Sequence, residues 1–190
     1  MKNKFTFLGE NRISATLVSG EYIWLAFLGE DNICSLQKNS VHNPNMIYWD
    51  VSVVGDEIIS MIEDTTYLYG ALDDLVNIGA KITKDNPTTI SYFIKDSGLT
   101  EKAIDLIKDT TYIYFLLPGI ESGINTKIGK YNKTTRAYVE TIDLTTIFNA
   151  KKIDIDANGV IWIVTNNDPS ELVKVWYSSG TWHYTIYTLS

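Results

Sequence analysis

Three polar residues near the C-terminal end of the chain have the spacing of calcium ligands. Asp154, Asp156 and Asn158, followed by Gly159, match the D-x-D-x-N-G opening of an EF-hand loop. An EF-hand also needs a bidentate carboxylate at its twelfth position and a helix on each side, but Thr165 stands at that position and the flanking residues have a strand pattern. We therefore interpret the segment as the end of a strand and an Asn-Gly hairpin turn, with a weak cation site as the alternative.

Carboxylates also recur in one set of loops, which connect the second and third expected strands of each repeat unit described below. Together they could dock a basic protein partner or hold a cation. A pair flanking a sugar bond could hydrolyse it. The simpler interpretation is ordinary polar loop composition. The residues of this expected acidic loop face are Glu30, Asp31, Asp73, Asp74, Glu121, Asp168 and Glu171.

The opposite ends of the same units are expected to be basic, because Lys and Arg gather in the connections between the third and fourth strands. Such a charge gradient could orient the stacking of one molecule on another. The residues are Lys38, Lys84, Lys130, Lys133 and Arg136.

Aromatic residues concentrate near the C-terminus. Alternation in a final strand would place Trp182 and Tyr184 on one face, and His183 and Tyr187 on the other. Such an apolar face predicts a neighbour, either the first unit of the same chain or another chain. A carbohydrate platform is the functional alternative. The candidate residues for self-association or ligand binding are Trp176, Trp182, Tyr184 and Tyr187.

Other patterns of catalysis and metal binding are missing from the sequence. Cys34, His42 and His183 are too few and too scattered for a zinc site or a Cys/His nucleophile. No nucleophile motif occurs, and the glycines between 119 and 123 are not followed by the helix that a phosphate-binding loop requires. We expect a non-enzymatic protein without a cofactor.

The composition of the 190 residues excludes further classes of protein. A hydrophobic content of 45% with 21% charged residues is typical of a globular chain and not of a disordered one. Sixteen basic against 23 acidic residues give a net charge of −7, which argues against binding to nucleic acid or to an anionic membrane surface. The first ten residues lack the apolar core of a signal peptide, and no apolar run reaches the ~20 residues of a membrane span. We expect a soluble protein, either cytoplasmic or associated with a virion.

An internal repeat of about 45 residues is the strongest pattern in the chain. Residues 59–69 and 104–114 are identical at seven of eleven positions. The units span approximately 13–56, 57–101, 102–149 and 150–190, and a strand is expected within residues 1–12. Short aromatic or apolar motifs mark each unit at spacings of 45, 45 and 48, beginning at Tyr22, Tyr67, Tyr112 and Val160.

Within each unit the hydrophobic period is two, which is typical of strands. The third unit has four strand-like segments at 102–108, 112–117, 124–131 and 136–142, separated by short turns. A tandem repeat of four-stranded antiparallel meanders is typical of a β-propeller. The sequence therefore predicts an all-β propeller of four blades, in which the recurrent aromatic side chains pack between blades.

The fourth unit carries a family resemblance. The segment from Asp154 through Gly159 and Trp162 to Thr165 resembles the D-x-x-G-x-I-W-x-x-T motif of sensor-type and NHL-like propeller repeats. The other three units share only the pattern of this motif, because they replace the Asn-Gly turn. The resemblance implies the fold and little about chemistry, since these propellers include binding modules, sensors and enzymes.

These observations favour a non-catalytic binding or structural module that presents the loop faces of a rigid propeller to a protein partner. A structural or receptor-binding component of a phage or virion would suit this description. One alternative is a carbohydrate-binding, lectin-like propeller, and another is a propeller enzyme that acts on glycans or lactones. The ring could close with four blades in one chain or with eight blades in two chains, and the sequence leaves both open.

Overall fold

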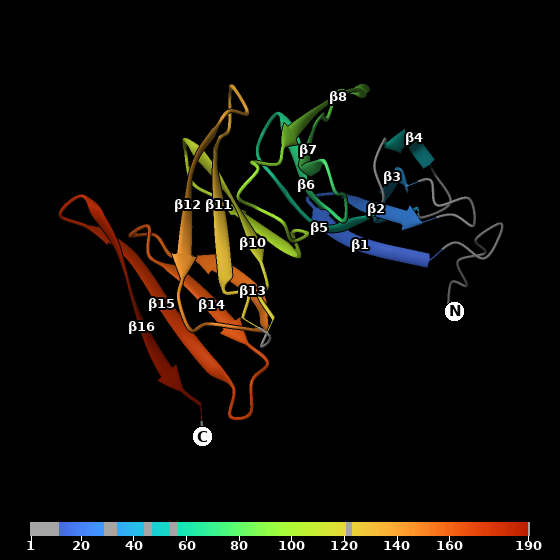
Figure 1. Ribbon diagram of the computed structural model, residues 1–190. Helices are drawn as coiled ribbons and strands as arrows, with labels where there is room; N and C mark the ends of the chain where they lie inside the picture. Colours follow the sequence, from blue (N-terminus) through green and yellow to red (C-terminus); the bar gives the residue numbers. More distant parts are fainter. Residues whose placement is uncertain (1–11, 29–33, 44–46, 54–56, 121–122, 190) are drawn as a thin grey trace.

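In a computed structural model the chain forms four antiparallel sheets of four strands each (Figure 1). The structure describes residues 12–28, 34–43, 47–53, 57–120 and 123–189, and for residues 47–53 and 87 the backbone alone. This described part contains no helix, and so none that could cross a membrane. In every sheet the strands pair in chain order, which confirms the meander blades predicted from the repeat. The strand expected within residues 1–12 lies outside the described residues, apart from Arg12, which begins β1.

Each blade takes up one repeat unit. Blade 1 contains β1 (Arg12–Ser19), β2 (Tyr22–Leu28), β3 (Cys34–Ser40) and β4 (Ile47–Val53). Blade 2 contains β5 (Ile58–Glu63), β6 (Tyr67–Leu72), β7 (Asn77–Thr83) and β8 (Asn86–Ile94). Blade 3 contains β9 (Asp105–Lys108), β10 (Tyr112–Leu117), β11 (Thr126–Asn132) and β12 (Tyr138–Leu144). Blade 4 contains β13 (Ala150–Ile155), β14 (Ile161–Thr165), β15 (Glu171–Ser178) and β16 (Thr181–Thr188).

The hydrophobic core lies between the blades, in three clusters that join blade 1 to 2, 2 to 3 and 3 to 4. The packing of strand β10 explains why its sequence is continuously apolar. Its Ile113 and Phe115 pack with blade 2, whereas Tyr114 and Leu116 pack with blade 4. Because a neighbouring blade covers each face of the strand, both sets of alternating side chains must be apolar.

The recurrent aromatic residue of the second strand is also tied to the turn that precedes it. In blades 2, 3 and 4 an Asp in this turn accepts backbone N–H groups with one carboxylate oxygen and the aromatic O–H or N–H with the other. The three side-chain pairs are Tyr69 with Asp64 at 2.9 Å, Tyr114 with Asp109 at 2.8 Å and Trp162 with Asp156 at 3.3 Å. These Asp residues therefore build the blade. Tyr69 and Tyr114 are buried between blades as the sequence predicts, whereas Trp162 is half-buried on a face of blade 4 that no described blade covers, so that part of the prediction is wrong.

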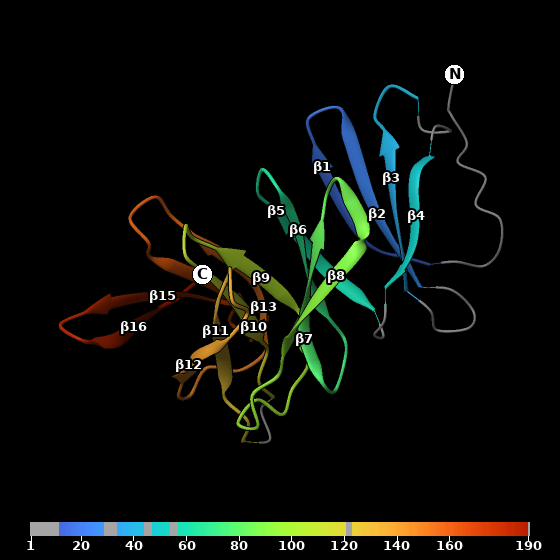
Figure 2. The ribbon, with the colours of Figure 1, turned by 90° about the horizontal axis from the view of Figure 1, so that it is seen from above.

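The four blades follow one another along an arch (Figures 1 and 2). Their first strands lie next to one another in the order β1, β5, β9 and β13. Blades 1 and 4 occupy the two ends of the arch, on either side of its open side (Figure 1). Within the described residues, β13 of blade 4 packs on β9 of blade 3. Blade 1 does not pack on blade 4 in the described part of the chain, so the arch is open.

Candidate functional site

The loops of the arch are gathered at two ends of the blades. The loops between second and third strands lie with the connections from blade to blade, because Asp73 N donates to Glu57 O at 2.8 Å. We call this the connection end. The hairpins between first and second strands lie with those between third and fourth strands, because Lys84 N donates to Thr66 O at 3.0 Å. We call this the hairpin end.

At the connection end, the two carboxylates of blade 2 are engaged within the protein. Asp74 Oδ1 accepts two backbone N–H groups of its own loop, at 2.6 and 3.1 Å. Partial burial opposes ionisation of this carboxyl, but its hydrogen bonds outweigh burial and lower the pKa of Asp74. Asp73 forms an ion pair with Lys102, and Lys95 Nζ donates to the carbonyl of Asp74 at 2.8 Å. Both residues therefore have structural partners.

In blade 4, Glu171 is likewise held by its loop. Glu171 Oε2 accepts a hydrogen bond from Asn167 Nδ2 at 2.9 Å, and Glu171 N donates to Thr165 Oγ1 at 3.1 Å. Asp168 is exposed. The structure thus describes four of the residues expected to form the acidic loop face, and one of the four is fully exposed. The others, which lie outside the described residues, are Glu30, Asp31 and Glu121.

The segment with the spacing of calcium ligands forms a tight turn. Asp156 Oδ1 accepts N–H groups from Asn158 and Val160 at 2.8 and 3.0 Å, and its Oδ2 accepts from Trp162. Asp154 is exposed and accepts the N–H of the next residue at 2.8 Å. Across the described part of the chain, no three His, Cys, Asp or Glu side chains are grouped to hold a metal ion.

The C-terminal aromatic residues are divided between the two faces of blade 4. Trp182 and Tyr184 pack with blade 3. Tyr184 donates its hydroxyl to Thr145 O at 2.6 Å, and Lys130 Nζ lies 5.4 Å from the centre of the Trp182 ring. These two half-buried residues therefore contribute to the interface between blades 3 and 4.

Trp176 and Tyr187 lie on the opposite face of blade 4, which no described blade covers. The register pairs Trp176 with His183, and their rings stack at a centroid distance of 5.6 Å. Tyr187 pairs with Leu172 and is exposed. Of the aromatic residues proposed from the sequence, these two are accessible to a partner.

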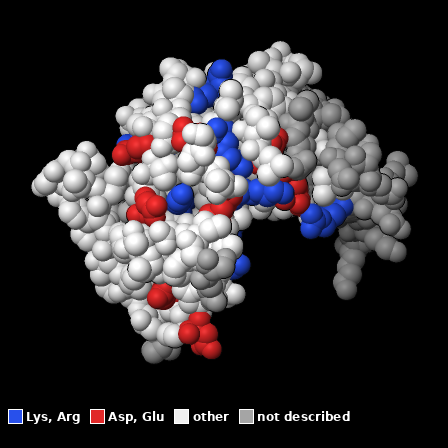
Figure 3. Space-filling model, in the orientation of Figure 1, with Lys and Arg blue, Asp and Glu red and all other residues white. Residues whose placement is uncertain are grey.

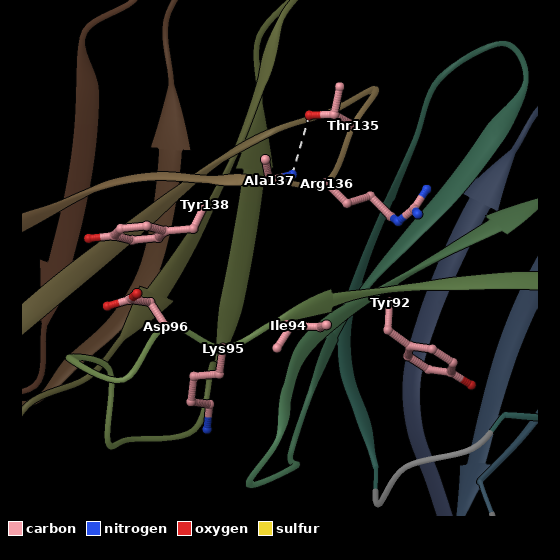
Figure 4. Close-up of a pocket in the computed structure, with 8 residues that line it drawn as sticks. All are labelled: Tyr92, Ile94, Lys95, Asp96, Thr135, Arg136, Ala137 and Tyr138. Carbon is pink, nitrogen blue, oxygen red and sulfur yellow. Dashed lines mark hydrogen bonds between the residues drawn. The ribbon is translucent and has the colours of Figure 1, made fainter.

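A pocket of about 370 Å³ opens between blades 2 and 3 (Figure 4). Its walls come from the end of β8 with the residues that follow it, and from the hairpin between β11 and β12. We call it the 2–3 groove. The residues that line it are Tyr92, Ile94, Lys95, Asp96, Thr135, Arg136, Ala137 and Tyr138.

The charged residues of the 2–3 groove differ in how they are held. Lys95 is bonded to the carbonyl of Asp74, and Asp96 Oδ2 accepts the N–H of Gly98 at 3.0 Å. In contrast, the guanidinium of Arg136 has no ion pair or hydrogen bond among the described residues. Figure 4 shows its side chain extending from the hairpin toward the strands of blade 2.

The surroundings of Arg136 are basic and apolar. Burial, and then the positive charge of Arg136, lower the pKa of Lys81. Ile94 is 67% exposed although it lies at the end of a strand. Tyr138 packs its ring edge-on against Tyr131 at a centroid distance of 5.6 Å and is 38% exposed. The groove therefore combines an unpaired cation with exposed apolar and aromatic surface.

The sequence identified Arg136 as one of several basic residues but did not identify the groove. The signal it offered is positional: Arg136 adopts a left-handed backbone with φ 63°, in a hairpin where the fourth unit has Ser179 and Gly180, with φ 54° and 84°. A bulky residue that replaces a small turn residue at such a position is unusual. Ile94 and Asp96 belong to no recurrent pattern of the four units.

A second pocket, of about 500 Å³, lies between the first hairpins of blades 3 and 4. Its acidic residues are Asp109 and Asp156. Both hold the aromatic residue of their own blade through the turn hydrogen bonds described above. We therefore assign the carboxylates of this pocket to the fold.

Comparison with known proteins supports the architecture. No family model and no curated protein matches the sequence. The computationally designed Ika4 protein is similar in structure, with a TM-score of 0.60 and 9% identity over 95% of this chain and 93% of that one. A prolyl endopeptidase is similar with a TM-score of 0.55 and 10% identity, over 88% of this chain but 25% of the endopeptidase. The WD40 β-propeller domain of Doa1 gives a TM-score of 0.45 at 9% identity, over 96% of this chain and 84% of that one.

At these identities the comparisons concern the fold alone. The designed protein is matched over nearly its full length, so the whole arrangement of four sheets recurs in another protein. Together with the meander topology and the cores between blades, this establishes the chain as a β-propeller of four blades.

Proposed function

We propose that the protein is a non-catalytic, protein-binding module, and that the 2–3 groove binds a short acidic and apolar segment of a protein partner. The observation that carries the proposal is the unpaired guanidinium of Arg136 in a pocket whose lining also includes the exposed Ile94 and Tyr138. Arginine and tyrosine are enriched among the residues that dominate binding energy at protein interfaces. A carboxylate of the partner would also relieve the repulsion between Arg136 and Lys81.

The backbone of Arg136 supports this assignment. A non-glycine residue at φ 63° is strained relative to glycine. In the hairpin, Asn132 Oδ1 accepts the N–H groups of Thr134 and Thr135 at 2.9 and 2.8 Å, which fixes the turn irrespective of the side chain at 136. The arginine therefore adds nothing that the turn needs, and a binding role accounts for its presence.

The groove is also better suited to a partner than the connection end is. There, Asp73, Asp74 and Glu171 already have intramolecular partners, so a basic protein would have to compete with existing hydrogen bonds and an ion pair. The volume of about 370 Å³ at the groove accommodates a few side chains of a bound peptide.

A selection from a displayed library of 12-residue peptides tests the proposal. We expect the wild-type chain to enrich peptides with Asp or Glu next to an apolar residue, and Arg136→Gly to weaken their binding at least tenfold by fluorescence anisotropy. Arg136→Gly suits the left-handed backbone, so the fold is retained.

Lys151→Ala is the matched control, because it removes one positive charge from an exposed position in β13, outside the groove. Its affinity should equal that of the wild type. Enrichment of peptides that bind Arg136→Gly and wild type equally, or of basic peptides, would contradict the proposal.

A further inference from the structure

Each blade has two faces, and the chain uses them in a fixed way. The forward face packs on the next blade and the rear face receives the preceding one. In β10 the forward face carries Tyr114 and Leu116, which pack with blade 4. The corresponding residues of β14 are Trp162 and Val164, because Trp162 pairs with Lys174 as Tyr114 pairs with Lys130. The forward face of blade 4 is therefore built like the others, but no described blade packs on it.

A lysine in the third strand shows the same relationship. In blade 2, Lys81 Nζ donates to Lys133 O in blade 3 at 3.1 Å. In blade 3, Lys130 lies over the ring of Trp182 in blade 4. In blade 4, the contacts of Lys174 are with rings of its own blade. They are Trp162 and Trp176, at 5.8 and 5.5 Å from Nζ to the ring centres.

The forward face of blade 4 exposes several apolar side chains to solvent. Val164 and Tyr187 are exposed, while Leu172 and Trp176 are partly exposed on the same face. A contiguous exposed apolar patch on a water-soluble protein marks an interaction surface. In the three existing junctions, the surface that covers such a face is the rear face of another blade.

Blade 1 offers a rear face. Its second strand carries Ile23 at the position of Ile113, since Ile23 precedes Trp24 as Ile113 precedes Tyr114. Ile23 pairs across the hairpin with Val18, which is 66% exposed. Leu25 and Phe27, farther along this face, are already buried within the chain, so the accessible part is confined to the hairpin end, at Ile23 and Val18.

The hairpin ends of the two faces also correspond in position. Lys81 reaches the hairpin between the third and fourth strands of the next blade. For Lys174, the equivalent hairpin of a following blade 1 begins at Val41 and His42, which are both exposed.

We propose that the forward face of blade 4 binds the rear face of blade 1 in a second copy of this chain, so that two chains complete one ring. Blades 1 and 4 lie on either side of the open side of the arch and do not pack on each other within the described part of one chain (Figures 1 and 3). Each copy supplies one forward and one rear face, so a two-fold axis generates two identical junctions. The ring then contains twice the four blades of one chain.

The mass in solution tests this pairing. By light scattering after size exclusion, the wild type should have twice the 21.5 kDa of one chain. Trp176→Asp and Val18→Asp should each reduce the mass to that of one chain, because an uncompensated carboxylate is costly in a dry junction. Tyr177→Asp is the matched control, since Tyr177 is a neighbouring aromatic residue, 58% exposed, on the other face of β15. It should stay dimeric.

Complementation identifies which faces meet. Tagged Trp176→Asp should capture untagged Val18→Asp, because one junction of that pair is wild type, and should not capture untagged Trp176→Asp. A monomeric wild type at 100 μM would overturn the proposal, as would assemblies larger than two chains. A dimer that survives Val18→Asp would also overturn it, because blade 4 would then pair with itself. Far-ultraviolet circular dichroism verifies that each variant is folded.

Discussion

Ser60 and Asp105 occupy the same position in consecutive blades, 45 residues apart, and Ser60 Oγ donates to Asp105 Oδ1 at 2.5 Å. The second carboxylate oxygen accepts the N–H of Ile153 at 3.2 Å and lies 3.6 Å from Lys152 Nζ. One side chain of β9 thus links the first strands of blades 2, 3 and 4. The position that Ser60 and Asp105 share in the repeat is therefore also a point at which consecutive blades are hydrogen-bonded to each other.

Removing this carboxylate should weaken the inner side of the arch. Asp105 is 5% exposed, so Asp105→Ala leaves two donors without a buried acceptor, and we expect a loss of about 1–3 kcal/mol in the free energy of unfolding. Urea denaturation followed by tryptophan fluorescence measures it. Asp154→Ala, at an exposed position of the next blade, should change stability by less than about 0.5 kcal/mol. Equal losses in the two variants would show that the inter-blade link contributes nothing.

The turn carboxylates predict an acid-sensitive stability. Partial burial opposes ionisation of Asp64, but hydrogen bonds from Thr66, Tyr67 and Tyr69 outweigh it and lower its pKa. Since the unfolded chain then binds more protons than the folded one, stability should be complete above the ordinary Asp pKa of about 4 and fall as the pH drops below it. Urea midpoints between pH 6 and pH 3 give this dependence. Asp64→Asn should show a shallower decline, and an unchanged decline would assign the acid sensitivity to other groups.

Gly79 of blade 2 packs directly against the ring of Phe115 in blade 3. A Cβ atom at this position would lie 2.3 Å from Cε1 of Phe115 and 2.8 Å from the carbonyl oxygen of Gly70. We expect Gly79→Ala to destabilise the protein by about 1–3 kcal/mol, because the buried ring must move. Thermal unfolding compares it with Gly98→Ala, where the nearest atom is the Asp96 carboxylate at 3.3 Å. An unchanged thermal stability of Gly79→Ala would mean that the two blades are packed less closely than the structure shows.

The strained residue of the 2–3 groove should be replaceable without loss of stability. Glycine adopts φ 63° more easily than arginine does, so Arg136→Gly should leave the unfolding free energy unchanged or raise it by up to about 1 kcal/mol. The same variant should lose peptide binding. A marked destabilisation on chemical denaturation would show that Arg136 supports the fold, and the binding role would lose its backbone argument.

Much of the fold could be predicted from the sequence because the copies of a repeat can be compared with one another. The segment expected at 112–117 is β10, and the turn at Asp109 was recognisable from its copy at Asp64. The open arch was not predictable, since a hydrophobic period of two fixes which side chains face a neighbouring blade and says nothing about the angle between blades.

The functional residues were harder to predict for a related reason. The acidity of Asp73 and Asp74 was visible, but their partners Lys102 and Lys95 come from a different segment, the connection between β8 and β9. The 2–3 groove unites residues about 40 positions apart that belong to no common motif. Acidic and basic side chains are interspersed on the face shown in Figure 3, and they do not form separate charged patches there.

Amide chemical-shift mapping of the ¹⁵N-labelled chain with a selected acidic peptide tests the proposed function most directly. Binding in the 2–3 groove predicts that the largest perturbations fall at residues 92–96 and 132–138, which include the lining residues and their hairpin. Perturbations centred instead on the loops around Asp74 and Glu171 would contradict the account and return the binding site to the connection end.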